Sequence, residues 1–89
     1  MITRTLTITN KLGLHARAAT KLAELAMQFK SEVTIHCDNK QAKANSVMGL
    51  LMLAGAQGKQ IEVSSDGADA QAALDAIAQL IEAKFEEED

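Results

Sequence analysis

The sequence has no tyrosine or tryptophan, only two phenylalanines and a single cysteine. One cysteine, Cys37, excludes an internal disulfide and a multi-cysteine metal site. Because both phenylalanines fall at apolar positions, no aromatic platform is left for stacking single-stranded nucleic acid. No apolar run approaches the roughly 18 residues of a membrane helix. We therefore expect no membrane insertion and no nucleic-acid partner.

The chain also lacks a basic and then apolar leader, a glycine-rich phosphate loop and paired carboxylates. We expect a cytoplasmic protein that does not complete a catalytic cycle alone and is instead a substrate for partner enzymes. Neighbouring strand residues face opposite ways, so His36 and Cys37 cannot share a metal ion, and we expect no metal or cofactor. Eighty-nine residues suit one domain spanning 1–89, and we expect a monomer.

The formal charge of −3 is unevenly distributed along the chain. Five of the twelve acids lie in residues 82–89, which hold one base, so we interpret this end as a solvated helix end. Residues 1–81 carry eight bases and seven acids. The bases close in sequence to His15 are Lys11, Arg17 and Lys21. Such a patch could steer an acidic protein partner.

Hydrophobic periodicity predicts seven elements. Alternating side chains predict strands over 2–9, 32–37, 40–44 and 58–64. Helical spacing predicts helices over 16–29, 47–53 and 70–85. Each strand has one apolar face, which favours an antiparallel sheet that is open to water on one side and covered by helices on the other. The predicted fold is α+β, a two-layer open-faced sandwich in which three helices cover a four-stranded antiparallel sheet, in the order βαββαβα.

Some single positions carry further predictions. Arg4 interrupts the apolar face of the first strand. An arginine is tolerated there because its long aliphatic stem lets the charged group reach water. Met27 and Phe29 extend the apolar face of the first helix, and Phe85 does so for the last. Asp69 is placed to cap the last helix.

The stretch from Gly13 to Ala19 sets a histidine at the start of an alanine-rich helix. The first backbone N–H groups of a helix have no partner within it, and together with the positive helix end they form an anion site. Arg17 adds a planar fork of donors suited to phosphate oxygens. We interpret His15 as a nucleophile that accepts a phosphoryl group and passes it on. The alternative is that His15 only caps the helix.

The stretch from Ser46 to Ala54 predicts a short helix that is apolar all round. Ser46 is a suitable N-cap and Gly55 a suitable stop. A small two-layer domain cannot bury every side of such a helix. We expect an exposed apolar patch, typical of a protein interface, formed by Val47, Met48, Leu51 and Met52. The alternative is that these residues belong to the core.

The run from Asn10 to Arg17, with Asn45-Ser46 and a short apolar helix some thirty positions later, resembles the HPr family of phosphocarriers of the phosphotransferase system. The resemblance covers almost the whole chain. It implies that Enzyme I, charged by phosphoenolpyruvate, phosphorylates Nδ1 of His15, and that an Enzyme IIA protein accepts the group. It also places the apolar patch beside His15, where both partners dock, with Leu14 and Lys21 among the contacts.

One departure is Ala18, where the family commonly has a proline after the arginine. Proline pre-sets φ in the first turn, so we expect a less preorganised loop but retained function. This change and the acidic end are more similar to the nitrogen-related branch than to the sugar-transport branch. In one branch the serine matching Ser46 is phosphorylated by a kinase, so Ser46 is a candidate regulatory site. A different class of function stays open, a non-catalytic module that binds a small anion or a protein through His15 and Arg17.

Overall fold

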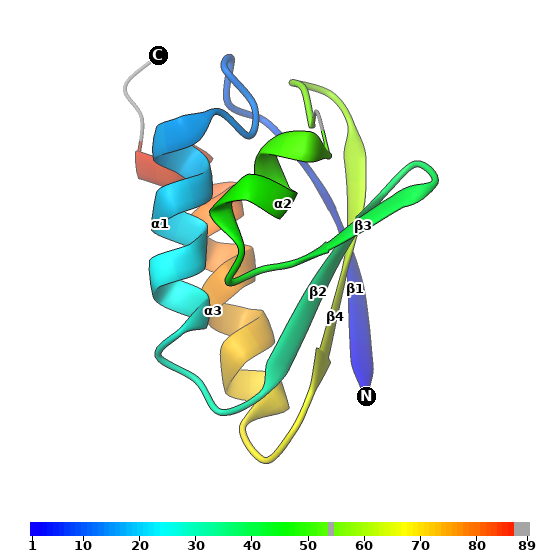
Figure 1. Ribbon diagram of the computed structural model, residues 1–89, viewed down its shortest axis with the longest axis vertical. Helices are drawn as coiled ribbons and strands as arrows, with labels where there is room; N and C mark the ends of the chain where they lie inside the picture. The colour runs from blue at the N-terminus through cyan, green and yellow to red at the C-terminus, as the bar shows by residue number, and fades with distance from the viewer. Residues whose placement is uncertain (54, 87–89) are drawn as a thin grey trace.

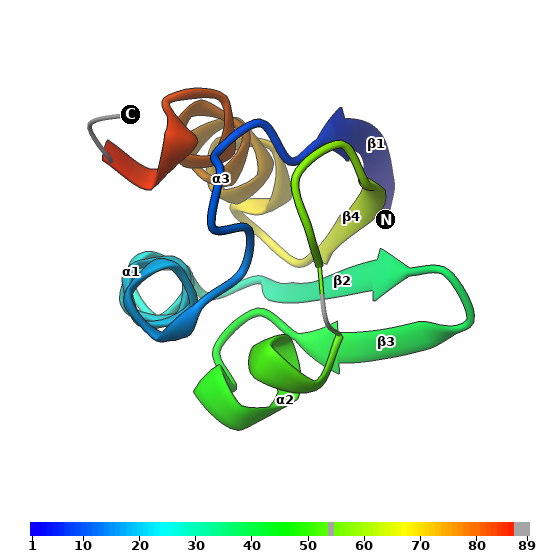
Figure 2. The same cartoon turned by 90° about the horizontal axis from the view of Figure 1, so that it is seen from above.

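The structure is a computed structural model that describes residues 1–53 and 55–86. Its described part runs in the predicted order (Figure 1). The elements are β1 (Ile2–Thr7), α1 (Ala16–Ala26), β2 (Glu32–Cys37), β3 (Lys40–Lys43), α2 (Val47–Met52), β4 (Gln60–Asp66), α3 (Ala70–Glu82) and the 3-10 turn η1 (Lys84–Glu86). The sheet order is β1-β4-β2-β3, and every neighbouring pair is antiparallel. Figure 2 shows α1 and α3 side by side against the sheet, with α2 beside β3. The predicted α+β sandwich is confirmed.

Alternation along the strands determines which face the helices cover. Leu6, Val33 and Ile35 point into the core, whereas the threonines of β1 face solvent. Cys37 is buried at the end of β2. Arg4 stays exposed, and its guanidinium lies 3.8 Å from the Asp75 carboxylate of α3. The arginine is therefore tolerated on the covered face because it reaches the polar edge of a helix.

Helix α1 ends at Ala26, three residues before the predicted end. The amides of Gln28 and Phe29 bond to carbonyls three residues back, so the chain tightens and leaves the α-helical path. Met27 is 70% exposed although its own amide still bonds four residues back to the Ala23 carbonyl at 3.0 Å, so the prediction that it joins the apolar face was wrong. Two strands also differ from the predicted bounds: β1 ends at Thr7, and β4 lies two residues later than predicted.

The C-terminal segment differs from the predicted continuous helix. Helix α3 ends at Glu82, and Lys84 and Phe85 adopt positive φ angles of 58° and 56°. This left-handed turn reverses the chain and buries Phe85 completely. The ammonium of Lys21 donates a hydrogen bond to the Phe85 carbonyl at 2.9 Å. Phe85 therefore closes the end of the core between α1 and α3, while the acidic residues 87–89 lie outside the described part.

Asp69 occupies the N-cap position of α3, but its side chain does not cap that helix. Its carboxylate accepts hydrogen bonds from the Lys30 amide at 2.9 Å, the Ser31 amide at 2.8 Å and the Ser31 hydroxyl. The predicted capping role is corrected: the carboxylate accepts hydrogen bonds from these donors, which lie in the loop after α1, and not from the amides of α3. The contact ties this loop to the start of α3, at the end of α1 opposite His15.

We expect Asp69→Asn to lower Tm by several degrees at neutral pH, with a smaller deficit in acid. The Ser31 hydroxyl, followed by the Lys30 amide, favours the carboxylate and holds the pKa of Asp69 below its ordinary value of 3.8. A carboxyl whose pKa is lowered by folding stabilises the fold above its unfolded pKa and loses that contribution as pH falls through the folded pKa. Thermal unfolding of both proteins from about pH 7 to about pH 2 measures this. A Tm difference that stays constant over that range would contradict the account.

Candidate functional site

His15 forms the N-cap of α1. Its backbone is extended, with φ −79° and ψ 179°, and its carbonyl accepts the helical bond from Ala19 at 2.8 Å. Its Nδ1 accepts a hydrogen bond from the Arg17 amide at 3.2 Å. An acceptor nitrogen carries no proton, so this contact assigns the lone pair to Nδ1 and the proton of the neutral ring to Nε2. The imidazole therefore turns its acceptor nitrogen toward the positive end of the helix.

Arg17 is the second residue of α1, and its side chain is exposed. The loop before the helix carries Lys11, which is also exposed. Lys21, one turn further along α1, is half-buried and bonds to the Phe85 carbonyl. The arrangement thus offers a main-chain donor at His15 and an exposed guanidinium on the same turn of the helix, a combination suited to an anionic group.

The loop that leads to His15 turns Leu14 inward. Leu14 is 5% exposed and belongs to the core. Its amide donates to the Gly55 carbonyl at 2.9 Å, which joins the loop to the segment after α2. The expectation that Leu14 contacts a partner is corrected: its side chain anchors the loop and offers no surface.

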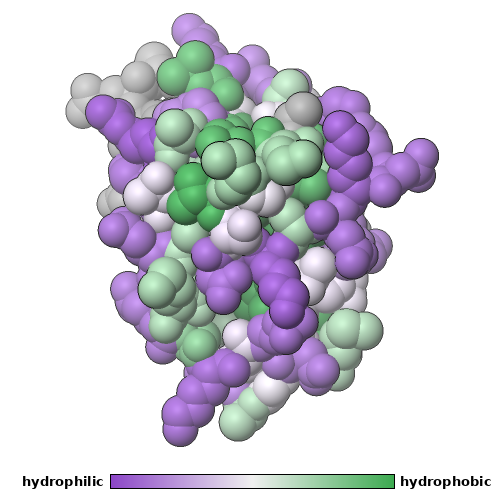
Figure 3. All heavy atoms as spheres, viewed as in Figure 1, coloured by the Kyte–Doolittle hydropathy of each residue, from purple (hydrophilic) through white to green (hydrophobic). Residues whose placement is uncertain are grey.

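Helix α2 presents an apolar surface beside α1. Met48 and Met52 are 68% and 69% exposed, while Val47 and Leu51 are half-buried and pack against the core. Leu50 is fully buried. Figure 3 shows hydrophobic residues gathered over α2 on this face. We name Met48, Met52 and the exposed edges of Val47 and Leu51 the α2 surface. The helix thus has both an exposed apolar patch and residues that belong to the core, so each of the two alternatives holds in part.

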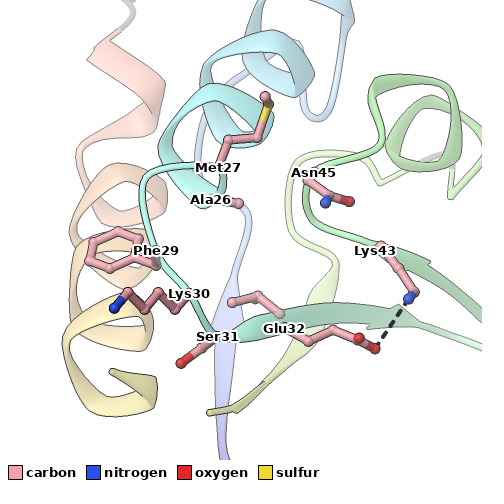
Figure 4. Close-up of a pocket in the computed structure, with 9 residues that line it drawn as sticks. Ala26, Met27, Phe29, Lys30, Ser31, Glu32, Lys43 and Asn45 are labelled. Atoms are coloured by element: carbon pink, nitrogen blue, oxygen red, sulfur yellow. Dashed lines mark ion pairs between the residues drawn. The ribbon is translucent and has the colours of Figure 1, made fainter. Parts of the chain in front are cut away.

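A separate hollow of about 360 Å³ lies at the other end of α1 (Figure 4). Met27, Lys30 and Asn45 line it, and Glu32 and Lys43 form an ion pair of 3.3 Å across its edge. It is far along α1 from His15 and contains none of the predicted site residues. This hollow is therefore separate from the candidate site.

Three comparisons with known proteins bear on this surface. A family model described as "PTS HPr component phosphorylation site" matches residues 2–83. The chain belongs to the HPr family. A protein named phosphocarrier protein NPr from Shewanella violacea is 60% identical over 84 residues, which cover 94% of this chain and 92% of that protein. The NPr of Escherichia coli K12 is 47% identical, with 98% of both chains covered. A crystal structure of HPr from Thermoanaerobacter tengcongensis superposes with a TM-score of 0.94 at 41% identity, over 99% of both chains.

Family membership confirms the predicted function at the level of a phosphocarrier protein of the phosphotransferase system. Other relatives bear the name HPr, among them one from Neisseria meningitidis serogroup B at 46% identity over 98% of both chains. HPr-family carriers work between phosphotransfer partners of that system.

Two features complete the surface of this family member. Leu12, in the loop before His15, is 69% exposed and was not among the predicted site residues. The sequence indicates this exposure, because Leu12 is an apolar residue in a turn between Lys11 and Gly13. It belongs to no strand or helix with an apolar face. Ser46 caps α2 as predicted, since its Oγ accepts a hydrogen bond from the Gly49 amide at 3.1 Å. Ser46 is half-buried, so its hydroxyl lies at the edge of the α2 surface.

Two absences apply to the described part of the chain. Within residues 1–53 and 55–86, no three His, Cys, Asp or Glu side chains are grouped so that they could hold a metal ion. No helix among those residues is both long enough and apolar enough to span a bilayer.

Proposed function

We propose that His15 carries the phosphoryl group of this cytoplasmic, monomeric carrier, and that Nδ1 is the bonding atom. The observation that carries the proposal is the hydrogen bond from the Arg17 amide to Nδ1. It keeps the lone pair at the helix end, where the negative charge of an incoming phosphoryl group is favoured. In the alternative, His15 only caps the helix and its ring needs no second role. No other histidine at a helix N-terminus would then be left to carry the phosphoryl group of this family.

The transfer balances as a displacement at phosphorus. The Nδ1 lone pair forms a P–N bond while the bond between phosphorus and the donor's leaving group breaks, and the donor retains that electron pair. The proton on Nε2 stays on the ring. Phosphorylation replaces the hydrogen bond at Nδ1, so the Arg17 amide becomes available to a phosphoryl oxygen. The exposed guanidinium of Arg17 supplies further donors. Discharge is the reverse step, with the acceptor's nucleophile attacking phosphorus and Nδ1 leaving.

The donor in this proposal is Enzyme I, and the acceptor is an Enzyme IIA protein, so the carrier itself is not an enzyme. The 60% identity to a protein named NPr favours the nitrogen-related branch. The chain also shares 46% identity with a protein named HPr, which is why an experiment must separate the branches. Incubating the phosphorylated protein with an Enzyme IIA of each branch answers this: faster discharge to the sugar-branch protein would overturn the assignment.

Intact-mass analysis tests the carrier itself. The protein is incubated with phosphoenolpyruvate, magnesium and an Enzyme I shown to charge another carrier. We expect a gain of one phosphoryl group that is lost in acid, and fragmentation that locates it on His15. An unmodified protein would instead support the module that binds an anion or a protein without covalent chemistry. An acid-stable group elsewhere would overturn the assignment of the phosphoryl group to His15.

We also propose Ser46 as a regulatory position, because its hydroxyl lies at the edge of the α2 surface. A phosphate there would add about two negative charges beside an apolar docking region. We expect Ser46→Asp to slow phosphoryl acceptance about 10-fold or more, and aspartate retains the helix cap. Ser46→Ala should accept at the wild-type rate while losing roughly 1 kcal/mol of stability with the cap. Equal acceptance rates for the two variants, measured with Enzyme I, would remove Ser46 from the regulatory proposal.

A further inference from the structure

The peptide unit just before His15 is held at both of its polar atoms. The side-chain amide of Asn10 donates from Nδ2 to the Gly13 carbonyl at 2.8 Å. The other atom of the same unit, the Leu14 amide, donates to the Gly55 carbonyl at 2.9 Å. A turn bond from the Gly13 amide to the Asn10 carbonyl, at 3.2 Å, closes the loop between them. This peptide plane cannot rotate without breaking two hydrogen bonds.

Steric contact restricts the loop further. Gly13 has φ +62°, and a Cβ on it would lie 2.3 Å from the Gly55 carbonyl oxygen. A Cβ on Gly55 would lie 2.8 Å from Ile8 and 2.9 Å from Leu14 side-chain carbons. The two glycines therefore let the loop before His15 approach the segment after α2 as closely as backbones permit. Leu14 is then fixed in the core, and His15 follows it directly.

Asn10 is an unusual choice for the position it occupies. Its side chain is fully buried. Burying an amide is unfavourable unless it is hydrogen-bonded, and an apolar side chain could fill the same space. What a carboxamide supplies and a hydrocarbon does not is a donor directed at the Gly13 carbonyl. The side chain therefore fixes the conformation of the loop through its hydrogen bond. Filling the space alone would require no polar group.

The first turn of α1 has Ala18 and no proline, so it has no ring to fix φ there. The restraints described above lie before the helix instead, at residues 10–14. We propose that Asn10 is a positioning residue for phosphoryl transfer. By fixing the Gly13–Leu14 peptide it holds the backbone of His15 extended and keeps Nδ1 at the Arg17 amide. This inference rests on the proposed role of His15.

The test replaces Asn10 with aspartate, which has nearly the same shape but no donor when ionised, and with serine, which is too short for the contact. Enzyme I is assayed with each variant as its substrate. We expect kcat to fall about 10-fold, since small displacements of a reacting group are costly. The α2 surface is untouched, so KM should stay within about twofold. Nitrogen chemical shifts of the His15 ring should show a smaller bias toward the Nε2-protonated form than in the wild type.

Asp69→Asn serves as the matched control, because it weakens the fold at the opposite end of α1. It should reduce Tm but leave kcat and the His15 ring shifts unchanged. Asn10 variants that lose Tm with wild-type kcat and ring shifts would show a structural role only and overturn the inference. If one Asn10 variant does not fold, the other decides. A wild-type protein that accepts no phosphoryl group would instead overturn the proposed function itself, and the positioning role with it.

Discussion

Replacing His15 with asparagine is expected to abolish phosphoryl acceptance while leaving thermal unfolding close to that of the wild type. Asparagine is among the best N-cap residues, so it can accept the hydrogen bond that Nδ1 now takes from the Arg17 amide. Its amide nitrogen is not a nucleophile, because its lone pair is delocalised into the carbonyl. Intact-mass analysis after incubation with Enzyme I and phosphoenolpyruvate should therefore show no added mass.

His15→Ala is the companion variant. It should also accept no phosphoryl group, but it removes the cap and should lose about 1 kcal/mol of stability, which is a Tm decrease of about 4–8 °C for a domain of this size. The pair separates capping from chemistry within one residue. Persistent phosphorylation of His15→Asn would show that the group resides on another side chain.

Introducing a charge on the α2 surface is expected to weaken binding to Enzyme I without altering the chemistry at His15. Met48 and Met52 are 68% and 69% exposed, so glutamate at either position fits without disturbing the core. Truncating a central apolar contact of an interface typically costs more than about 1 kcal/mol. We therefore expect about a 10-fold rise in Kd for Met48→Glu or Met52→Glu. Titration calorimetry with Enzyme I measures this change.

The chain supplies a matched control in Met27, which is 70% exposed at the other end of α1. Met27→Glu makes the same chemical change at the same exposure, so it corrects for the added charge. We expect its Kd to stay within about twofold of the wild type. If all three variants weaken binding equally, the effect is a general electrostatic one and the α2 surface is not the docking region. Leu51 is less suitable for this test because it is half-buried and packs against the core.

Local patterns predicted the elements well where one residue type repeats along a face. The threonines of β1 and the alanines of α1 each mark one side of an element, so the two-layer fold followed from the sequence. Ends were less predictable. Helix α1 stops at Ala26 although Phe29 continues the apolar period, because the last amides bond three residues back and not four.

The candidate site was predictable at its centre and less so at its edges. His15 and Arg17 were identified because a glycine, a histidine and an alanine-rich helix follow each other in the chain. Leu12 and Leu14 are the same residue type and flank the same glycine, yet Leu12 is exposed and Leu14 is buried. Which of the two points inward depends on the Gly55 carbonyl, some forty residues away, that binds the Leu14 amide.

The sequence by itself determined the α+β class, the placement of His15 at a helix start and the apolar character of α2, because periodicity and helix propensity act between near neighbours. Only the tertiary structure decided that Asp69 binds the Ser31 loop, that Phe85 turns back into the core and that Asn10 holds the peptide before His15. Asp69 and Phe85 have contacts that join segments distant in the chain, and the role of Asn10 depends on the packing of Gly13 against Gly55. Their geometry is therefore set when the layers pack together, and no pattern along the chain encodes it.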